Sequence, residues 1–143
     1  MKIEKILMAV LFISTVLCWG LTPIIEKIGL TKVSPIVGVT IRSIAITVIL
    51  VVVTILTGDI KDLINTDIKS ISLFSLSGIL AGLLGMWTYY QILKMEATSK
   101  IVPLTATYPL VTAFLSILIL GEAVTLPRIV GTALIVGGIY LVK

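Results

Sequence analysis

Long runs without a charged residue constrain this chain more than any other feature. Residues 6–25 contain no charge, and similar apolar stretches follow, separated by short polar segments. Charged residues make up 13% of the chain, against about 25% in a soluble globular domain. A helix of about 20 apolar residues crosses the hydrocarbon core of a bilayer, where apolar side chains can face outward. We therefore expect an all-α integral membrane protein.

The charges and turn residues divide the chain into a bundle of five predicted transmembrane helices, all within one domain, residues 1–143. The second helix has a helix-opening pair, Ser34 and Pro35, and a stop at Gly58. The polar stretch 59–69 is expected to be an exposed connection with room for a short interfacial helix. The predicted helices cover approximately residues 5–28, 34–57, 71–94, 101–121 and 125–142.

Two further expectations concern the helix ends. Pro23 should kink or loosen the last turn of the first helix, because proline removes a backbone donor. Glu26 and Glu122 are expected at helix ends, where a carboxylate stays in contact with water. No carboxylate is expected in the middle of a span, so a proton relay through a midplane acid is not supported.

The N-terminus also invites comparison with a cleaved signal peptide, since Lys2 and Lys5 precede an apolar run. That run is longer than the usual apolar region of a signal, and no small-x-small cleavage pattern follows it. We expect a retained membrane span.

Composition excludes several classes of function. The chain has no His, and Cys18 is its one Cys, so zinc, haem and thiol sites lack a ligand set, and neither a metal nor another cofactor is expected. No nucleophile and base pair supports an enzyme. The net charge of +4 comes from scattered residues rather than a basic cluster, so no nucleic-acid partner is expected.

Basic residues set the orientation of a membrane protein, because Lys and Arg favour the cytoplasmic side. With five helices, the Lys and Arg residues at the helix ends and in the connections are divided evenly between the two sides of the membrane. Arg42, inside the second helix, is not counted on either side. One interpretation is dual topology, in which copies insert both ways and form an antiparallel homodimer; the other is a weak bias with one fixed orientation. One side carries Lys2, Lys5, Lys61, Lys69 and Arg128, and the other carries Lys27, Lys32, Lys94, Lys100 and Lys143.

Small residues in two predicted helices indicate close helix packing, because small side chains let backbones approach in lipid. These contacts can form within one chain or between two copies. For the last helix we favour a contact between subunits. The residues are Gly78, Gly82, Gly131, Ala133, Gly137 and Gly138.

Polar and aromatic residues at membrane depth are candidates for a substrate pathway. Tyr and Trp near helix ends are often interfacial anchors, and Arg42 can instead reach the nearby surface. Pro109 frees a backbone carbonyl that lipid cannot satisfy, which is typical of a bending or cavity-lining element. The predicted pathway residues are Trp19, Thr22, Pro23, Arg42, Trp87, Tyr90, Gln91, Thr105, Tyr108 and Pro109.

Several of these stretches together resemble the EamA domain of the drug/metabolite transporter superfamily. They are CWGLTP at residues 18–23, GLLGMWTYY at 82–90, PLVTAFL at 109–115, LGE at 120–122 and GTALIVGG at 131–138. The resemblance covers essentially the whole chain. Family members usually carry two such domains as an inverted pair, whereas this chain resembles the short single-domain bacterial and archaeal group.

The resemblance implies a multi-pass protein of a prokaryotic plasma membrane that works as a homodimer, with lipid and a small-molecule substrate as its other partners. Its predicted function is secondary transport of small organic metabolites, such as amino acids or related amines, by alternating access. The last helix also resembles the dimerising helix of small multidrug resistance proteins. Those proteins carry an essential acid in their first helix, whereas here the first predicted helix has no acid before Glu26, which argues against drug–proton antiport. A lipid-linked sugar flippase subunit and a non-transporting membrane assembly subunit are the alternatives.

Overall fold

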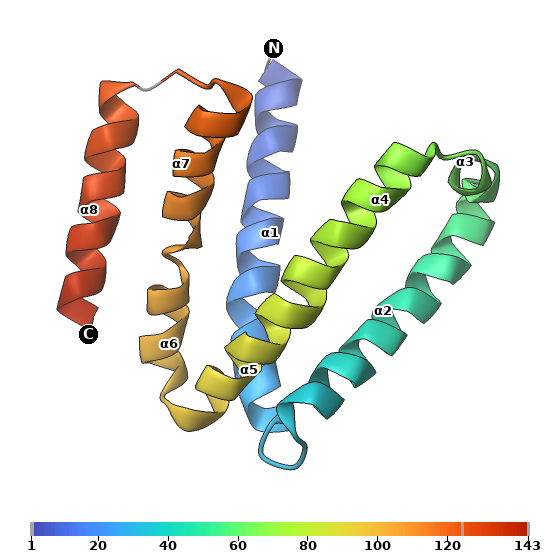
Figure 1. Cartoon of the computed structure of the whole chain (residues 1–143), viewed down its shortest axis with the longest axis horizontal. Helices are drawn as coiled ribbons and strands as arrows, with labels where there is room; N and C mark the ends of the chain where they lie inside the picture. The colour runs from blue at the N-terminus through green and yellow to red at the C-terminus, as the bar shows by residue number, and fades with distance from the viewer. Residues whose placement is uncertain (1, 124, 143) are drawn as a thin grey trace. The chain divides into compact units, whose positions relative to one another are not determined.

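The computed structural model describes residues 2–123 and 125–142, and these residues form helices and no strand (Figure 1). Four helical stretches are long and apolar enough to cross a membrane, and a shorter apolar helix, Leu126–Leu141, follows them. The prediction of an all-helical membrane protein is confirmed at this level. The four stretches are Ile3–Gly29, Pro35–Thr57, Ile68–Met95 and Thr98–Leu120.

The chain divides into two compact units, residues 1–94 and 95–143. The candidate site belongs entirely to the first unit, so the two are described separately. Lys143, which contributes to the predicted charge balance, lies outside the described residues.

The first unit begins with α1 (Lys2–Gly29), which a short connection links to α2 (Pro35–Thr57). Pro23 does not end α1, which continues through it to Gly29, and the predicted kink at Pro23 stays a prediction. Pro23 is buried. Ser34 precedes α2 as predicted, although its side chain makes no capping hydrogen bond.

Gly58 ends α2 as predicted, with φ of 85°, a left-handed conformation that glycine adopts without steric cost. The expected short helix follows as α3 (Ile60–Ile64). Next, α4 (Ile68–Ser77) begins three residues earlier than the predicted start at 71. The reason is a cap: Asp67 Oδ1 accepts a hydrogen bond of 3.0 Å from the Ser70 amide.

The third membrane stretch is not one uniform α-helix. It consists of α4, a π-helical segment η1 (Gly78–Gly85) and α5 (Met86–Met95). The predicted α-helical spacing of Gly78 and Gly82 therefore does not apply, because a π-helix has wider turns. The wider turns also change which face of α5 is directed toward α1 and α2.

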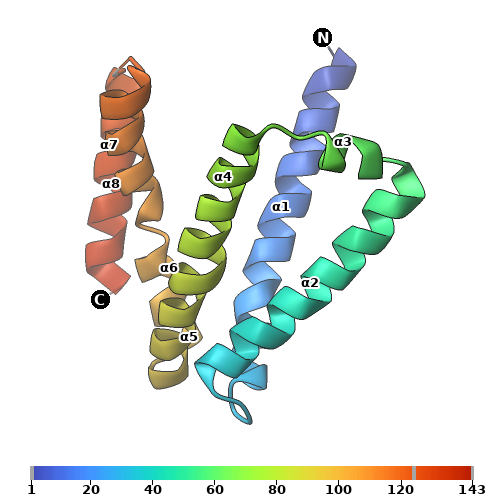
Figure 2. The same cartoon turned by 45° about the vertical axis from the view of Figure 1, so that its right-hand side comes forward.

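The helices of the first unit converge at one end, where α1 ends, α2 begins and α5 lies, and they diverge toward α3 (Figures 1 and 2). Its most deeply buried apolar side chains lie at this converging end: Leu30, Val39, Tyr90 and Leu93 are each 3% exposed or less. Apolar side chains elsewhere on α1 and α2 are largely exposed. Lipid or another protein surface must therefore cover them.

The second unit contains α6 (Thr98–Thr105), α7 (Tyr108–Leu120) and α8 (Leu126–Val142). The predicted helix 101–121 is interrupted after Thr105, and Pro109 occupies the first turn of α7. This agrees with the expectation of a bending element, since Pro109 cannot supply a backbone donor to the preceding turn. The chain then turns back, and α8 contacts α6.

The cap at Asp67 gives a test of the fold outside the membrane. Hydrogen bonds from the side chain and then the backbone of Ser70 lower the pKa of the Asp67 carboxyl. Asp67→Ala should therefore speed hydrogen exchange at the Ser70 amide, whereas Asp67→Asn keeps an acceptor and serves as the matched control.

The lowered pKa fixes the sign of the pH dependence. The contribution of the charged cap is present above the pKa of the unfolded chain and is lost as the pH falls through the folded-state pKa. Wild-type exchange should therefore approach that of the Asn variant in acid, because a protonated carboxyl keeps an acceptor oxygen but loses its charge. Equal protection in the Ala and Asn variants at neutral pH would contradict this account.

Candidate functional site

A pocket of about 440 Å³ lies at the converging end of the first unit. Its walls come from the last turns of α1, the connection that follows, the first turns of α2, and Tyr90 of α5. Most of the lining is apolar, and Glu26 and Arg42 are its two charged residues. The lining residues are Thr22, Ile25, Glu26, Gly29, Leu30, Val33, Gly38, Ile41, Arg42 and Tyr90.

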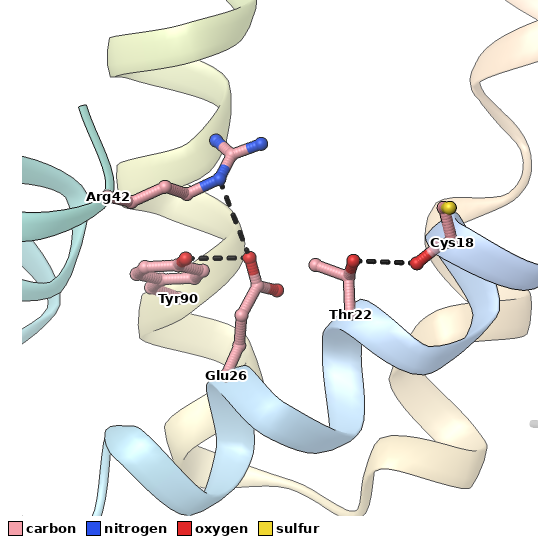
Figure 3. Close-up of polar contacts among 5 residues, drawn as sticks. All are labelled: Cys18, Thr22, Glu26, Arg42 and Tyr90. Atoms are coloured by element: carbon pink, nitrogen blue, oxygen red, sulfur yellow. Dashed lines mark hydrogen bonds and ion pairs between the residues drawn. The ribbon is translucent and has the colours of Figure 1, made fainter. Parts of the chain in front are cut away.

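Glu26 is the most shielded charged group of this pocket, with a side chain 9% exposed. Its Oε1 accepts a hydrogen bond of 2.7 Å from the Tyr90 hydroxyl (Figure 3). Glu26 lies in the last turn of α1, as expected, but the expectation that its carboxylate is exposed to water is wrong. The helix continues to Gly29, and α2 and α5 pack over the face that carries Glu26.

Arg42 projects from α2 toward the same carboxylate, and its Nε lies 3.9 Å from Glu26 Oε1 (Figure 3). The two terminal nitrogens of the guanidinium point away from Glu26 in this view, and the side chain is 38% exposed. Arg42 thus lines the pocket, and its predicted role in a substrate pathway stays a prediction. A planar guanidinium can bind a carboxylate through two parallel hydrogen bonds.

Tyr90 reaches Glu26 because α2 offers no side chain at Gly38. A Cβ built on Gly38 would lie 3.1 Å from Tyr90 Cε2 and 3.5 Å from Leu30 Cδ2. Glycine therefore allows the buried aromatic ring to pack directly against the α2 backbone. This close approach fixes the phenol whose hydroxyl donates to the carboxylate.

Two lysines join the helices beside the pocket. Lys27 Nζ donates to the Leu93 carbonyl at 2.5 Å and lies 3.4 Å from the Lys94 carbonyl. Lys94 Nζ donates to the Val33 carbonyl at 3.1 Å. The cation of Lys27 complements the partial negative charge at the end of α5, where helix carbonyls lack amide partners.

Three predicted pathway residues, Thr22, Arg42 and Tyr90, come together in this pocket. The Thr22 hydroxyl donates to the Cys18 carbonyl at 2.7 Å, and its methyl group points to the side of Glu26 (Figure 3). Pro23 is buried beside them without lining the pocket. Trp19 and Trp87 are 66% and 40% exposed, and neither they nor Gln91 line it.

The other predicted pathway residues belong to the second unit. Thr105 donates to the carbonyls of Ile101 and Val102 in its own helix, Tyr108 is 58% exposed, and Pro109 is exposed. Their predicted roles, like those of Trp19, Trp87 and Gln91, stay predictions.

Sequence reasoning missed Glu26 as a site residue, along with Gly38. One signal was available: Glu26 follows Thr22 by four positions, so both lie on one face of a helix. Because Thr22 was already expected to face the pathway, the same reasoning applied one turn further would have included Glu26.

The profile of the EamA-like transporter family matches residues 6–143. The chain belongs to the EamA-like transporter family. This confirms the resemblance inferred from the motifs, and the apolar helices accord with a multi-pass membrane protein. The EamA family consists of transporters rather than enzymes.

One curated relative of this EamA-like chain is an uncharacterized protein of Methanocaldococcus jannaschii, 39% identical over 83 residues. The matching segment covers 58% of this chain and 60% of that protein. No solved structure matches the chain.

The contact between Gly38 and Tyr90 predicts how this EamA-like site responds to a larger residue. Gly38→Val should lower the midpoint of thermal unfolding in detergent, because the side chain displaces the Tyr90 ring at a cost of about 1–3 kcal/mol. Gly20→Val is the matched control, since no heavy atom lies within 4 Å of a Cβ at that position. Equal midpoints for the two variants would contradict the packing described.

Proposed function

We propose that the chain is a secondary transporter of small organic metabolites and that amino acids are its substrates. The observation that supports this is the pairing of Glu26 and Arg42 across one pocket in the family of transporters to which the chain belongs. An amino acid carries both an ammonium and a carboxylate group. Glu26 can bind the first and Arg42 the second.

The balance of charge favours amino acids over simple amines. Glu26 and Arg42 together have no net charge, and a zwitterion leaves that sum unchanged. A cationic amine would add a positive charge beside Arg42 in a poorly solvated pocket, where uncompensated charge is costly. The apolar walls from Ile25, Leu30 and Ile41 suit the side chain of the substrate.

Uptake by reconstituted protein tests this function. Liposomes that contain the chain should accumulate amino acids from a metabolite mixture, as measured by mass spectrometry of the lumen. Glu26→Gln and Arg42→Gln should each reduce the initial rate about tenfold or more, since each removes one charge-assisted contact worth about 1.5–3 kcal/mol.

Asp62→Asn is the matched control, because Asp62 is an exposed acid on α3 outside the pocket. It should transport at the wild-type rate. Absence of uptake of any solute by the wild-type chain would contradict the proposal and favour a non-transporting assembly subunit. Movement of a lipid-linked sugar instead would favour the flippase subunit.

We further propose that residues 1–143 form a single domain of five membrane spans, with α8 as the fifth, in a prokaryotic plasma membrane. Two copies would pair antiparallel and provide alternating access by moving against each other. The balanced Lys and Arg tally supports this arrangement. A Cβ on Gly78, Gly82, Gly131, Gly137 or Gly138 would meet no described heavy atom within 4 Å, and Ala133 is exposed, which leaves these surfaces open to a second copy.

Orientation can be measured directly with a protease-cleavable tag at each terminus. In sealed membrane vesicles, each tag should be cleaved from both faces in comparable amounts, because the basic residues are evenly distributed. Asn65→Lys and Thr31→Lys, in connections predicted on opposite faces, should shift the insertion in opposite directions.

Each biased variant alone should lose uptake, and their co-expression should restore it. Full uptake by either variant alone would contradict the antiparallel pair, as would wild-type tags that are each cleaved from a single face.

A further inference from the structure

We infer that Glu26 is also a proton-binding site, and that the pocket carries monocarboxylates together with one proton as a second class of substrate. This inference rests on the proposed transport function and extends it. The proton binds the Glu26 carboxylate, and the carboxylate of the substrate binds Arg42.

Position distinguishes Glu26 from the other acidic residues of the chain. The sequence contains seven Asp and Glu residues. Six of them lie in the first turn of α1 or in the connections between the membrane stretches: Glu4, Asp59, Asp62, Asp67, Glu96 and Glu122. Of these seven acids, Glu26 alone lines the pocket, and it lies inside the first membrane stretch.

The two oxygens of Glu26 differ in their surroundings. Oε1 accepts from Tyr90 and faces Arg42, whereas Oε2 has no hydrogen-bond partner among the described residues (Figure 3). Every buried side-chain oxygen in the described part of the chain has a hydrogen-bond partner. Because Oε2 has none, it is not buried, and it is accessible from the pocket. A proton from water can therefore add to Oε2 while Oε1 keeps the bond from Tyr90.

The groups that face Glu26 come from each helix packed around it. Arg42 faces it from α2, and Tyr90 and Tyr89 lie near it on α5. On α1 itself, the adjacent Lys27 donates to the carbonyls at the end of α5. Arg42 is thus the cation aimed at Glu26, and neutralising Glu26 leaves the charge of Arg42 available to another anion.

Charge balance links the proton to the substrate. The ionised pair is neutral, so a bound monocarboxylate alone would leave the pocket with one negative charge. A proton on Glu26 restores neutrality, and burying a net charge away from water is unfavourable. Binding of the proton and binding of the carboxylate therefore strengthen each other by the same factor.

The same reasoning gives a different result for an amino acid. A zwitterion already leaves the pocket neutral, and its ammonium group needs the ionised form of Glu26. Amino acids should therefore move without a coupled proton. The number of protons carried per substrate is then set by the net charge of that substrate.

Serine and glycerate test this inference, because they differ only in an ammonium group against a hydroxyl group. The probes are labelled serine and labelled glycerate, added to liposomes with a neutral lumen and either an acidic or a neutral medium. Acidic medium should raise the initial glycerate uptake about fivefold or more, whereas serine uptake changes less than about twofold. A pH-sensitive dye in the lumen should report acidification with glycerate and not with serine. Empty liposomes provide the background.

Glu26→Gln mimics the protonated carboxyl, so it should take up glycerate without dependence on the pH of the medium and should lose serine uptake. Its retained glycerate uptake shows that it is folded; a variant inactive with both substrates while its unfolding midpoint is unchanged would overturn the inference. Wild-type serine uptake without acid-driven glycerate uptake would also overturn it while leaving the proposed function intact. Failure of wild-type protein to take up either substrate would contradict both.

Discussion

Three helices of the first unit meet around polar groups that lipid cannot solvate. The Glu26 carboxylate accepts a hydrogen bond from Tyr90 and faces the Arg42 guanidinium, so each helix supplies one member of the group. Away from water, a charge left without a partner costs far more than at a protein surface. The arrangement of α1, α2 and α5 therefore depends on keeping these groups together, and the pocket exists where they meet.

This constraint also explains why the buried core is so small. The shielded apolar side chains gather beside the polar group, while the remaining apolar surface of the long helices faces outward. In water such exposure would be unfavourable, but lipid tails are as apolar as leucine, so there is little drive to bury it within the chain. In a bilayer, it is the few polar groups that need contacts within the protein. The lysines that bind helix-end carbonyls beside the pocket follow the same principle.

The depth of the site has a consequence for transport. Glu26 lies three residues before the end of α1, which corresponds to about 5 Å along the helix axis, and Arg42 lies about 10 Å into α2. The pocket is therefore nearer to the membrane face that holds the α1–α2 connection than to the midplane. In the antiparallel pair proposed above, each face of the membrane would have one such pocket, and alternating access would open them in turn.

Hydropathy in the sequence determined the membrane environment, and motifs determined the family. The bounds of the long helices could be predicted to within a few residues, because in lipid each apolar stretch must satisfy its backbone hydrogen bonds locally as a helix. Side chains of Thr22, Arg42 and Tyr90 could be singled out in the same way. Only the tertiary structure decided that they converge on Glu26. Tyr90 is 64 positions away from Glu26, and the wider turns of the π-helical η1 change which side chains of α5 are directed toward α1 and α2. Contacts between helices depend on rotation and on small gaps such as Gly38, and neither is encoded in the hydropathy of a single segment.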